Sequence, residues 1–165
     1  MHDDCKLYEM LVLGGAQAGL SWATILKRRA EYRKAFAAWD LDAVARFDDA
    51  DVERLLAPDS PANIIRNRSK VKSAVKNARA AVTVRAEFGS LDKFFWSFVG
   101  FKPILNTREA HEPMPAVSPA SERMSKDMKK RGFTFCGPTI MYAFMQTCGM
   151  VNDHQRQCFC YGADA

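Results

Sequence analysis

Apolar residues recur along this chain at the three- and four-residue spacing of amphipathic helices, with short polar or glycine-containing breaks between segments. Gly14 and Gly15 are expected to loosen the first of these helices. The pattern predicts helices over about residues 4–13, 22–39, 40–47, 51–57, 64–87, 91–100, 118–132 and 138–149. Residues suited to helix N-caps precede many of them, namely Asp3 or Asp4, Ser21, Asp40, Asp51, Ser90, and Ser118 or Ser121.

No segment shows the period-two alternation that is typical of a strand. The sequence therefore predicts one all-α domain over residues 1–165, with about seven to nine helices joined by short loops. A chain of 165 residues can bury a substantial core, and the aromatic helix LDKFFWSFVG is expected to lie inside it. The proline-containing stretch Phe101 to Val117 predicts a long irregular connection.

The distribution of charge along the chain is more informative than the net charge, which is only +5. Seven basic residues and no acidic residue lie between Ser60 and Ala86. Taken alone, such a run is more typical of a solvated helix face. Solvated helices generally mix the two signs, however, so the run is also the strongest indication of a polyanionic partner in the composition. The seven are Arg66, Arg68, Lys70, Lys72, Lys76, Arg79 and Arg85.

Cysteine usage and hydropathy indicate the cellular compartment in which the chain is expected. Five cysteines form no regular framework, which indicates reduced thiols or metal ligands in a reducing compartment. The acidic and polar start, MHDDCK, predicts no signal peptide. No apolar run approaches the roughly 18 residues needed to span a bilayer, so no membrane association is expected.

The stretch Lys129 to Tyr161 combines a basic segment, a glycine-bounded turn and a helix. Pro138 is expected at the first position of that helix, and Gly149 just past its end. The turn from Gly132 to Gly137 would present free backbone N–H groups at the helix N-terminus, which suits a phosphate. This layout is that of a helix-hairpin-helix element, which holds DNA phosphates without reading sequence. An ordinary αα-corner has the same layout.

Several segments resemble the DNA-3-methyladenine glycosylase I (Tag) family of helix-hairpin-helix glycosylases. They are LVLGGAQAGLSWATILKRR, IIRNRSKVKSAVKNA, FFWSFV and KKRGFTFCGPTIMYAFMQTCGMVNDHQRQCFCY, and the resemblance runs from about Lys6 to Tyr161. It implies a monomeric base-excision repair enzyme that flips 3-methyladenine out of alkylated double-stranded DNA and hydrolyses its N-glycosidic bond. Such an enzyme works in the cytoplasm at the nucleoid in a bacterium, and in the nucleus or an organelle in a eukaryote.

The resemblance also implies a base pocket, lined by Gln17 and closed by Trp22. The family pattern LEGxQAGLSW has Glu where this chain has Gly14, and that Glu contacts the exocyclic amine edge of the flipped base. Its loss is expected to weaken recognition by about 1.5–3 kcal/mol, or roughly 10- to 100-fold. The chain begins after a family segment resembling CxW and YHDxEWG, which supplies further aromatic residues of the pocket.

A structural zinc ion is implied by the same resemblance. His154 and Cys158, in an H-x3-C spacing, match two of the four family ligands. The other two belong to the N-terminal segment that precedes this chain, so the site is expected to be incomplete. Cys5, Cys160 or His2 could complete it, and the alternative is that His154 and Cys158 simply pack near the C-terminus.

Further roles follow for the hairpin and for Asp153. Asp153 lies where other members of the superfamily carry a catalytic Asp, and local hydrogen bonding is the alternative. The function predicted is excision of 3-methyladenine. One alternative is a non-catalytic or impaired DNA-binding descendant, which Gly14 and the family segment missing before this chain favour. The other is a poorly stable, incomplete gene product. The residues expected to contact DNA are Lys129, Lys130, Arg131, Gly132, Phe133, Thr134, Gly137 and Thr139.

Overall fold

The computed structural model describes residues 1–109 and 112–162. Within these ranges the chain forms nine α-helices, one 3-10 helix and two short strands, which confirms the predicted all-α class. None of the described helices is long and apolar enough to cross a lipid bilayer. The elements are α1 (Asp4–Gln17), α2 (Trp22–Leu26), α3 (Arg29–Ala35), η1 (Ala37–Trp39), α4 (Leu41–Ala45), α5 (Asp49–Leu56), α6 (Arg68–Phe88), α7 (Leu91–Ser97), β1 (Ile104–Leu105), α8 (Pro119–Lys130), α9 (Pro138–Thr147) and β2 (Val151–Asn152).

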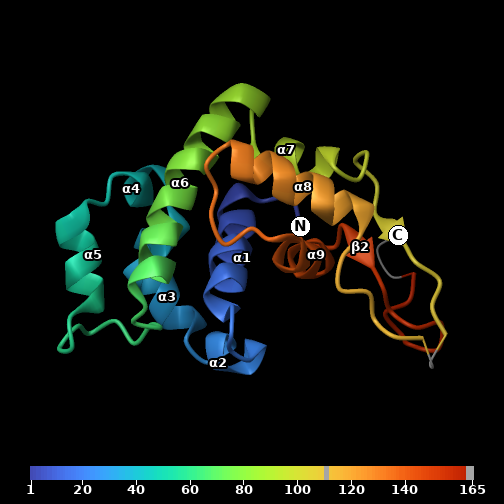
Figure 1. Ribbon diagram of the computed structural model, residues 1–165, viewed down its shortest axis with the longest axis horizontal. Helices are drawn as coiled ribbons and strands as arrows, with labels where there is room; N and C mark the ends of the chain where they lie inside the picture. The colour runs from blue at the N-terminus through green and yellow to red at the C-terminus, as the bar shows by residue number, and fades with distance from the viewer. Residues whose placement is uncertain (110–111, 163–165) are drawn as a thin grey trace.

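Helix α1 lies at the centre of the molecule and packs against both α6 and α9 (Figure 1). Most of it is buried, and Leu7 and Leu11 are at most 1% exposed. The Tyr8 hydroxyl donates a hydrogen bond of 2.9 Å to the Ala74 carbonyl of α6, so the polar tip of this buried ring is satisfied. The aromatic helix α7 packs against α1 and α6 and is buried as predicted.

The expected loosening of α1 at Gly14 and Gly15 is wrong, because the helix continues through both. Residues before and after the glycines are buried, and tertiary packing outweighs the weak helix propensity of glycine. Lys70 of α6 then donates to the carbonyls of Ala16 and Ala18 at 2.9 and 2.7 Å. This cation satisfies carbonyls at the C-terminal end of α1 that have no partner within the helix.

The single helix expected over residues 22–39 is divided into α2, α3 and a left-handed turn. Ala37, Ala38 and Trp39 have φ angles of 48°, 53° and 73°, which non-glycine residues rarely adopt. The turn places Trp39 against Phe36, with ring centroids 6.1 Å apart and ring planes 7° apart. Both rings are buried, and this burial stabilises a turn that the helical spacing of the sequence does not indicate.

Side-chain caps begin the helices at most of the predicted positions. Ser21, Asp40 and Ser90 each accept a hydrogen bond from the backbone N–H three residues later. The expectation that Asp51 caps a helix is wrong. Asp48 is the cap of α5, and Asp51 accepts in return from the Asp48 N–H, so the two form a capping box.

Most basic residues of the run on α6 form ion pairs or hydrogen bonds within the molecule. Acidic residues of α4 and α5 pair with three of its cations. Arg79 donates instead to the carbonyls of Ala45 and Phe47, at 2.9 and 2.6 Å. The run therefore fastens α4 and α5 to α6, and it is neither a free cationic surface nor only a solvated face. The ion pairs are Arg68–Glu53, Lys72–Asp49 and Arg85–Asp42.

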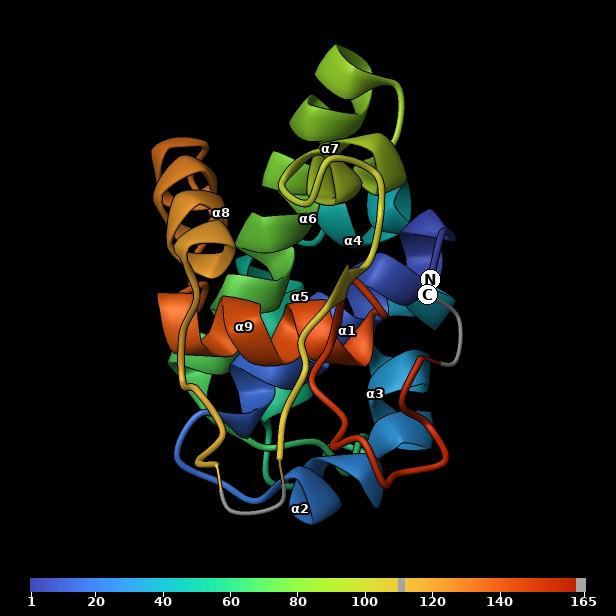
Figure 2. The ribbon, with the colours of Figure 1, turned by 90° about the vertical axis from the view of Figure 1, so that its right-hand side faces the viewer.

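A short parallel ladder departs from the prediction that no strand is present. Ile104 pairs with Val151, and Leu105 pairs with Asn152. Strands of two residues are too short for alternation to show in a sequence. The ladder joins the connection between α7 and α8 to the segment after α9 (Figure 2). Residues 110–111 of that connection lie outside the described residues.

Candidate functional site

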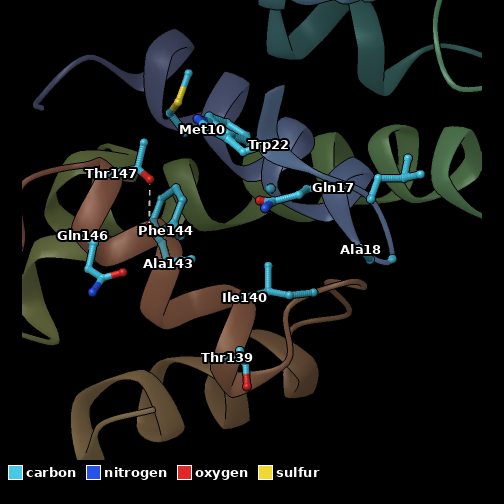
Figure 3. Close-up of a pocket in the computed structure, with 13 residues that line it drawn as sticks. Met10, Gln17, Ala18, Trp22, Thr139, Ile140, Ala143, Phe144, Gln146 and Thr147 are labelled. Atoms are coloured by element: carbon cyan, nitrogen blue, oxygen red, sulfur yellow. Dashed lines mark hydrogen bonds between the residues drawn. The ribbon is translucent and has the colours of Figure 1, made fainter. Parts of the chain in front are cut away.

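A cavity of about 400 Å³ lies between the end of α1, α2 and α9 (Figure 3). Its volume is in the range of small-molecule sites. The described residues that line it include no charged side chain, so the cavity is uncharged and mixes apolar and amide or hydroxyl groups. They are Met10, Gly14, Gln17, Ala18, Gly19, Leu20, Trp22, Thr139, Ile140, Ala143, Phe144, Gln146 and Thr147.

The positions predicted for the base pocket come together in this cavity. Gly14 and Gln17 are three residues apart on α1 and therefore share a face. Trp22 reaches the cavity from α2, half-buried. The opposite wall of the cavity, to which α9 contributes Ile140 and Phe144, is not predicted from the sequence. The four-residue spacing of these two residues is that of one helix face, and such spacing does not distinguish the core from a pocket wall.

The polar side chains of the cavity differ in whether they are already hydrogen-bonded. Gln146 Nε2 donates to Asp153 at 2.7 Å, and the Thr147 hydroxyl donates to the Ala143 carbonyl at 2.8 Å (Figure 3). The side-chain amide of Gln17 has no hydrogen-bond partner within the described residues. Its donor and its acceptor are thus both available to a ligand.

Residues 131–137 form a short turn that joins α8 to α9, as the sequence predicts. This turn and the helix ends beside it are called the hairpin. Gly132 and Phe135 have φ angles of 89° and 51°, which turn the chain within this short segment. Phe133 is 2% exposed and anchors the turn in the core. Gly137, the N-cap of α9, has no side chain to bond the N–H groups of the first helical turn, so these remain for another acceptor.

Contacts from two other helices hold this turn in place. Asn77 of α6, 2% exposed, accepts from the Thr134 N–H at 2.8 Å and donates to the Thr134 carbonyl at 3.0 Å. Gly15 of α1 lies so close to Phe135 that an added Cβ would be 3.1 Å from the Phe135 Cβ. Thr139 is exposed on the first turn of α9 and also lines the cavity. The hairpin and the cavity therefore share an edge.

The basic residues predicted for DNA binding have two different surroundings. Lys129 and Lys130 are exposed at the end of α8, and neither has an ion pair within the described chain. Arg131 donates to Glu87 at 2.6 Å and to Asp127 at 2.9 Å. Its guanidinium also lies 4.8 and 5.4 Å from the centroids of two phenyl rings of α6 and α7. Arg131 thus has a structural role, whereas the two lysines are free for a partner.

The residues expected to bind zinc lie close together after β2. His154 Nδ1 and Cys158 Sγ are 3.5 Å apart. Cys160 joins them, and one donor atom from each of the three residues lies within 4.8 Å of the others. His2 lies elsewhere, because its Nδ1 is 2.8 Å from Asp92 and its ring stacks on an α7 tryptophan.

Asp153 is a buried acceptor next to Gln146 of the cavity wall. It accepts from Tyr142 at 2.6 Å, from Gln146 at 2.7 Å and from Asn106 at 2.8 Å. Burial raises the pKa of Asp153, but these three hydrogen bonds and the nearby Arg108 outweigh it, so the pKa lies below its ordinary value. Asp153 does not line the cavity, and its contact with Gln146 links it to the cavity wall.

Together these features define an all-α protein in which an uncharged cavity of about 400 Å³ adjoins a short turn between two helices, with free backbone donors at the start of the second helix. Residues 1–161 match the family model described as methyladenine glycosylase. The chain belongs to the methyladenine glycosylase family.

Named relatives and solved structures agree with this assignment. The chain is 45% identical over 159 residues to DNA-3-methyladenine glycosylase 1 of Escherichia coli (strain K12), covering 96% of this chain and 83% of that protein. It superposes on a crystal structure of 3-methyladenine DNA glycosylase I with a TM-score of 0.91 and 44% identity, covering 98% and 87% of the two chains. A point mutant of such an enzyme in complex with 3-methyladenine gives a TM-score of 0.93 at 32% identity, covering 100% and 87%.

The paired hydrogen bonds of Asn77 predict that this residue fixes the hairpin. Asn77→Ala should leave the N–H and carbonyl of Thr134 without partners, and each of these partly buried groups left unpaired should cost up to about 3 kcal/mol. Urea unfolding should show the reduced stability, and hydrogen exchange should show faster exchange of the Thr134 amide. Ser73→Ala, one turn earlier on α6, is the matched control. Unchanged protection of Thr134 in Asn77→Ala would contradict the prediction.

Proposed function

We propose that this protein is a monofunctional, monomeric DNA glycosylase that hydrolyses the N-glycosidic bond of 3-methyladenine in alkylated double-stranded DNA. The observation that carries the proposal is the cavity itself. Trp22 offers a flat aromatic face and Gln17 a free amide, which are the two kinds of contact that hold a flipped base. A relative at 45% identity named for this activity, and a similar structure that contains 3-methyladenine, support the choice of base.

The chemistry of this base suits an uncharged pocket. Methylation at N3 makes the base cationic in DNA, and breakage of the bond to C1′ releases it neutral. Water provides the oxygen that bonds to C1′, and its proton passes to solvent. A cationic purine can stack on Trp22 with a cation–π contribution. Because the leaving group is already activated, the residues of this chain need to hold and orient the base more than to protonate it.

A second function has one specific observation in its favour. Gly14 leaves the cavity without the carboxylate that the family resemblance implies at this position, so base recognition is weaker on that side. A protein that binds DNA through the hairpin and excises slowly, or not at all, fits this difference.

The hairpin is the proposed DNA contact, as a helix-hairpin-helix element. The N–H groups at the start of α9, including that of Thr139, would bond a phosphate, with Lys129 and Lys130 beside them. Arg131 and Phe133 would support this surface from behind, since both are engaged in contacts within the protein. Such a surface binds the backbone and leaves the choice of lesion to the cavity.

Excision is expected to be detectable in this chain and stronger in Gly14→Glu. The introduced carboxylate would attract the cationic base, and the expected gain is about 10- to 100-fold in single-turnover release of 3-methyladenine from alkylated DNA. Gly14 has room for a side chain, because an added Cβ would contact only Ile140 Cγ2 at 3.9 Å.

Gly14→Gln is the matched control for this gain, because it adds similar volume without charge. Release by neither the native chain nor Gly14→Glu, with DNA binding intact, would favour the non-catalytic descendant. Equal gains from Gln and Glu would show that charge is not the missing property.

Neutralising Lys129 and Lys130 together with Gln should weaken binding to all DNA sequences alike. The slope of log K against log salt should become shallower by about 0.9 for each phosphate that the protein no longer neutralises. Lys34→Gln is the control, because Lys34 pairs with Glu31 on α3, a helix that lies apart from α8 (Figure 1). Arg131→Gln should mainly lower the unfolding midpoint. An unchanged salt slope in the double lysine variant would exclude this surface as the DNA contact.

We also propose a structural zinc ion held by His154, Cys158 and Cys160, which together leave a tetrahedral site one protein ligand short. Donor atoms of a tetrahedral zinc site lie roughly 3.3–3.8 Å apart, and the separation of 3.5 Å between His154 Nδ1 and Cys158 Sγ matches this range. Cys160 is near enough for a small rotamer change to bring it into the same site. The ion would cross-link the segment after β2 and would take no part in bond hydrolysis.

Cobalt substitution tests this ligand set. Cys158→Ser and Cys160→Ser should each reduce the cobalt–thiolate absorption and the metal content of the purified protein. Cys5→Ser is the control, because Cys5 is exposed on the first turn of α1. Full thiolate absorption in Cys160→Ser would remove Cys160 from the set, and no bound metal in the native protein would overturn the proposal.

A further inference from the structure

The side-chain amide of Gln146, which lines the cavity from α9, is held in one orientation. Its Nε2 donates to Asp153 Oδ2 at 2.7 Å and lies 3.4 Å from the Met114 sulfur. A carboxylate only accepts hydrogen bonds, so Gln146 must turn its nitrogen, and not its oxygen, toward Asp153. The carbonyl oxygen Oε1 accepts from no residue that the structure describes. Gln146 therefore offers a ligand a hydrogen-bond acceptor.

Asp153 is itself fixed from two further directions. It is 5% exposed, and it accepts from the Tyr142 hydroxyl at 2.6 Å and from Asn106 Nδ2 at 2.8 Å. Asn106 directly follows β1 and Asp153 directly follows β2, so the two-strand ladder brings these side chains together. The orientation of the Gln146 amide thus depends on a buried acceptor that the fold holds in place, and it is set before any ligand binds.

Gln146 lies across the cavity from Gln17 and Trp22, which reach it from α1 and α2 (Figure 3). The proposed function places the base against those two residues and a phosphate at Thr139, at the start of α9. Thr139 and Gln146 are seven residues apart on this helix, or about 10 Å along its axis. The deoxyribose joins the base to the backbone, so in this arrangement it lies along the α9 wall.

The reaction places positive charge on that deoxyribose. When the glycosidic bond breaks, its electron pair goes to N9 of the base, which leaves neutral, and the sugar becomes an oxocarbenium cation. Water then bonds to C1′, and its proton passes to solvent. A fixed acceptor stabilises the developing cation without having to reorient, whereas an amide nitrogen in the same place would repel it. No charged side chain among the described lining residues contributes this stabilisation.

We propose that Gln146 Oε1 stabilises the positive charge that develops on the deoxyribose, and that Asp153 is the positioning residue that keeps this oxygen turned to the cavity. The inference rests on the proposed function, since it assumes that the glycosidic bond of a nucleotide is broken here. Asp153 acts through Gln146 and does not touch the substrate. The pair should therefore affect bond breakage more than the binding of DNA.

Binding of two abasic DNA analogues tests the proposal. A tetrahydrofuran analogue has a neutral sugar ring, and a pyrrolidine analogue has a ring that is cationic at neutral pH. Fluorescence anisotropy with duplexes that contain each analogue gives the ratio of the tetrahydrofuran to the pyrrolidine dissociation constant. In the native chain this ratio should be about 10 or more, as expected for a hydrogen bond to a charged group. Gln146→Met should bring it close to 1 and leave binding of the tetrahydrofuran duplex unchanged.

Variants of Asp153 separate the orientation of the amide from the charge of the carboxylate. In Asp153→Asn the remaining oxygen can still accept from Gln146 and Tyr142, while Asn106 turns its own amide to accept from the new nitrogen. This variant should keep most of the native ratio, whereas Asp153→Ala should lower the ratio as far as Gln146→Met does. The double variant Gln146→Met with Asp153→Ala should show no further loss. Equal losses in Asp153→Asn and Asp153→Ala would overturn the positioning role.

Gln17→Met is the matched control, because it makes the same change on the opposite wall of the cavity. It should slow the release of 3-methyladenine and leave the ratio unchanged, since neither analogue carries a base. A native ratio near 1, or one that Gln146→Met does not lower, would overturn the inference and leave the glycosylase function standing if 3-methyladenine is released. A native chain that binds neither duplex and releases no base would overturn both.

Discussion

The close contact between Gly15 and Phe135 is the constraint on which the site depends. It lets the central helix α1 approach the hairpin turn directly, and α1 also forms one wall of the cavity. Asn77 holds the same turn from α6 through Thr134. Phe135 has a positive φ, and contacts from α1 and α6 hold the turn in this conformation. The spacing between the cavity and the hairpin is therefore set by the core, and a base and its phosphate would be held by one rigid unit.

Most of the positive charge in this chain serves the fold. The basic run of α6 pairs with α4 and α5, Lys70 closes the end of α1, and Arg131 joins α8 to α6 and α7. Exposed lysines remain at the hairpin, which is where the helix N-terminus already favours an anion. Binding of a polyanion at the hairpin, as proposed, would depend on these local groups more than on the total charge of the protein.

The sequence predicts the features that follow from neighbouring residues. Most N-caps, the proline at the start of α9 and the buried aromatic helix depend on residues a few positions apart, and the structure confirms these features, with Asp48 in place of Asp51 as the cap of α5. The sequence does not predict features that depend on contacts between residues far apart in the chain. The left-handed turn at Trp39 is held by aromatic burial, and the two-residue ladder exists only through its partner. Family resemblance, and no local pattern, predicts Gly14 and Gln17 for the base pocket, and both line the cavity. Asn77 has no local signal, because its partner lies 57 residues away.

The uncharged cavity has a consequence for how such an enzyme selects its substrate. A base that is cationic in DNA leaves readily, so the barrier to its release is low before any protein group acts on it. The choice of substrate then depends on which bases the cavity can bind. Since no charged group among the described residues lines the cavity, this binding depends on shape and stacking. A change at Gly14 alters shape without removing a catalytic proton donor or acceptor. In this chain the residue at position 14 should therefore affect the choice of base more than the mechanism by which the glycosidic bond is broken.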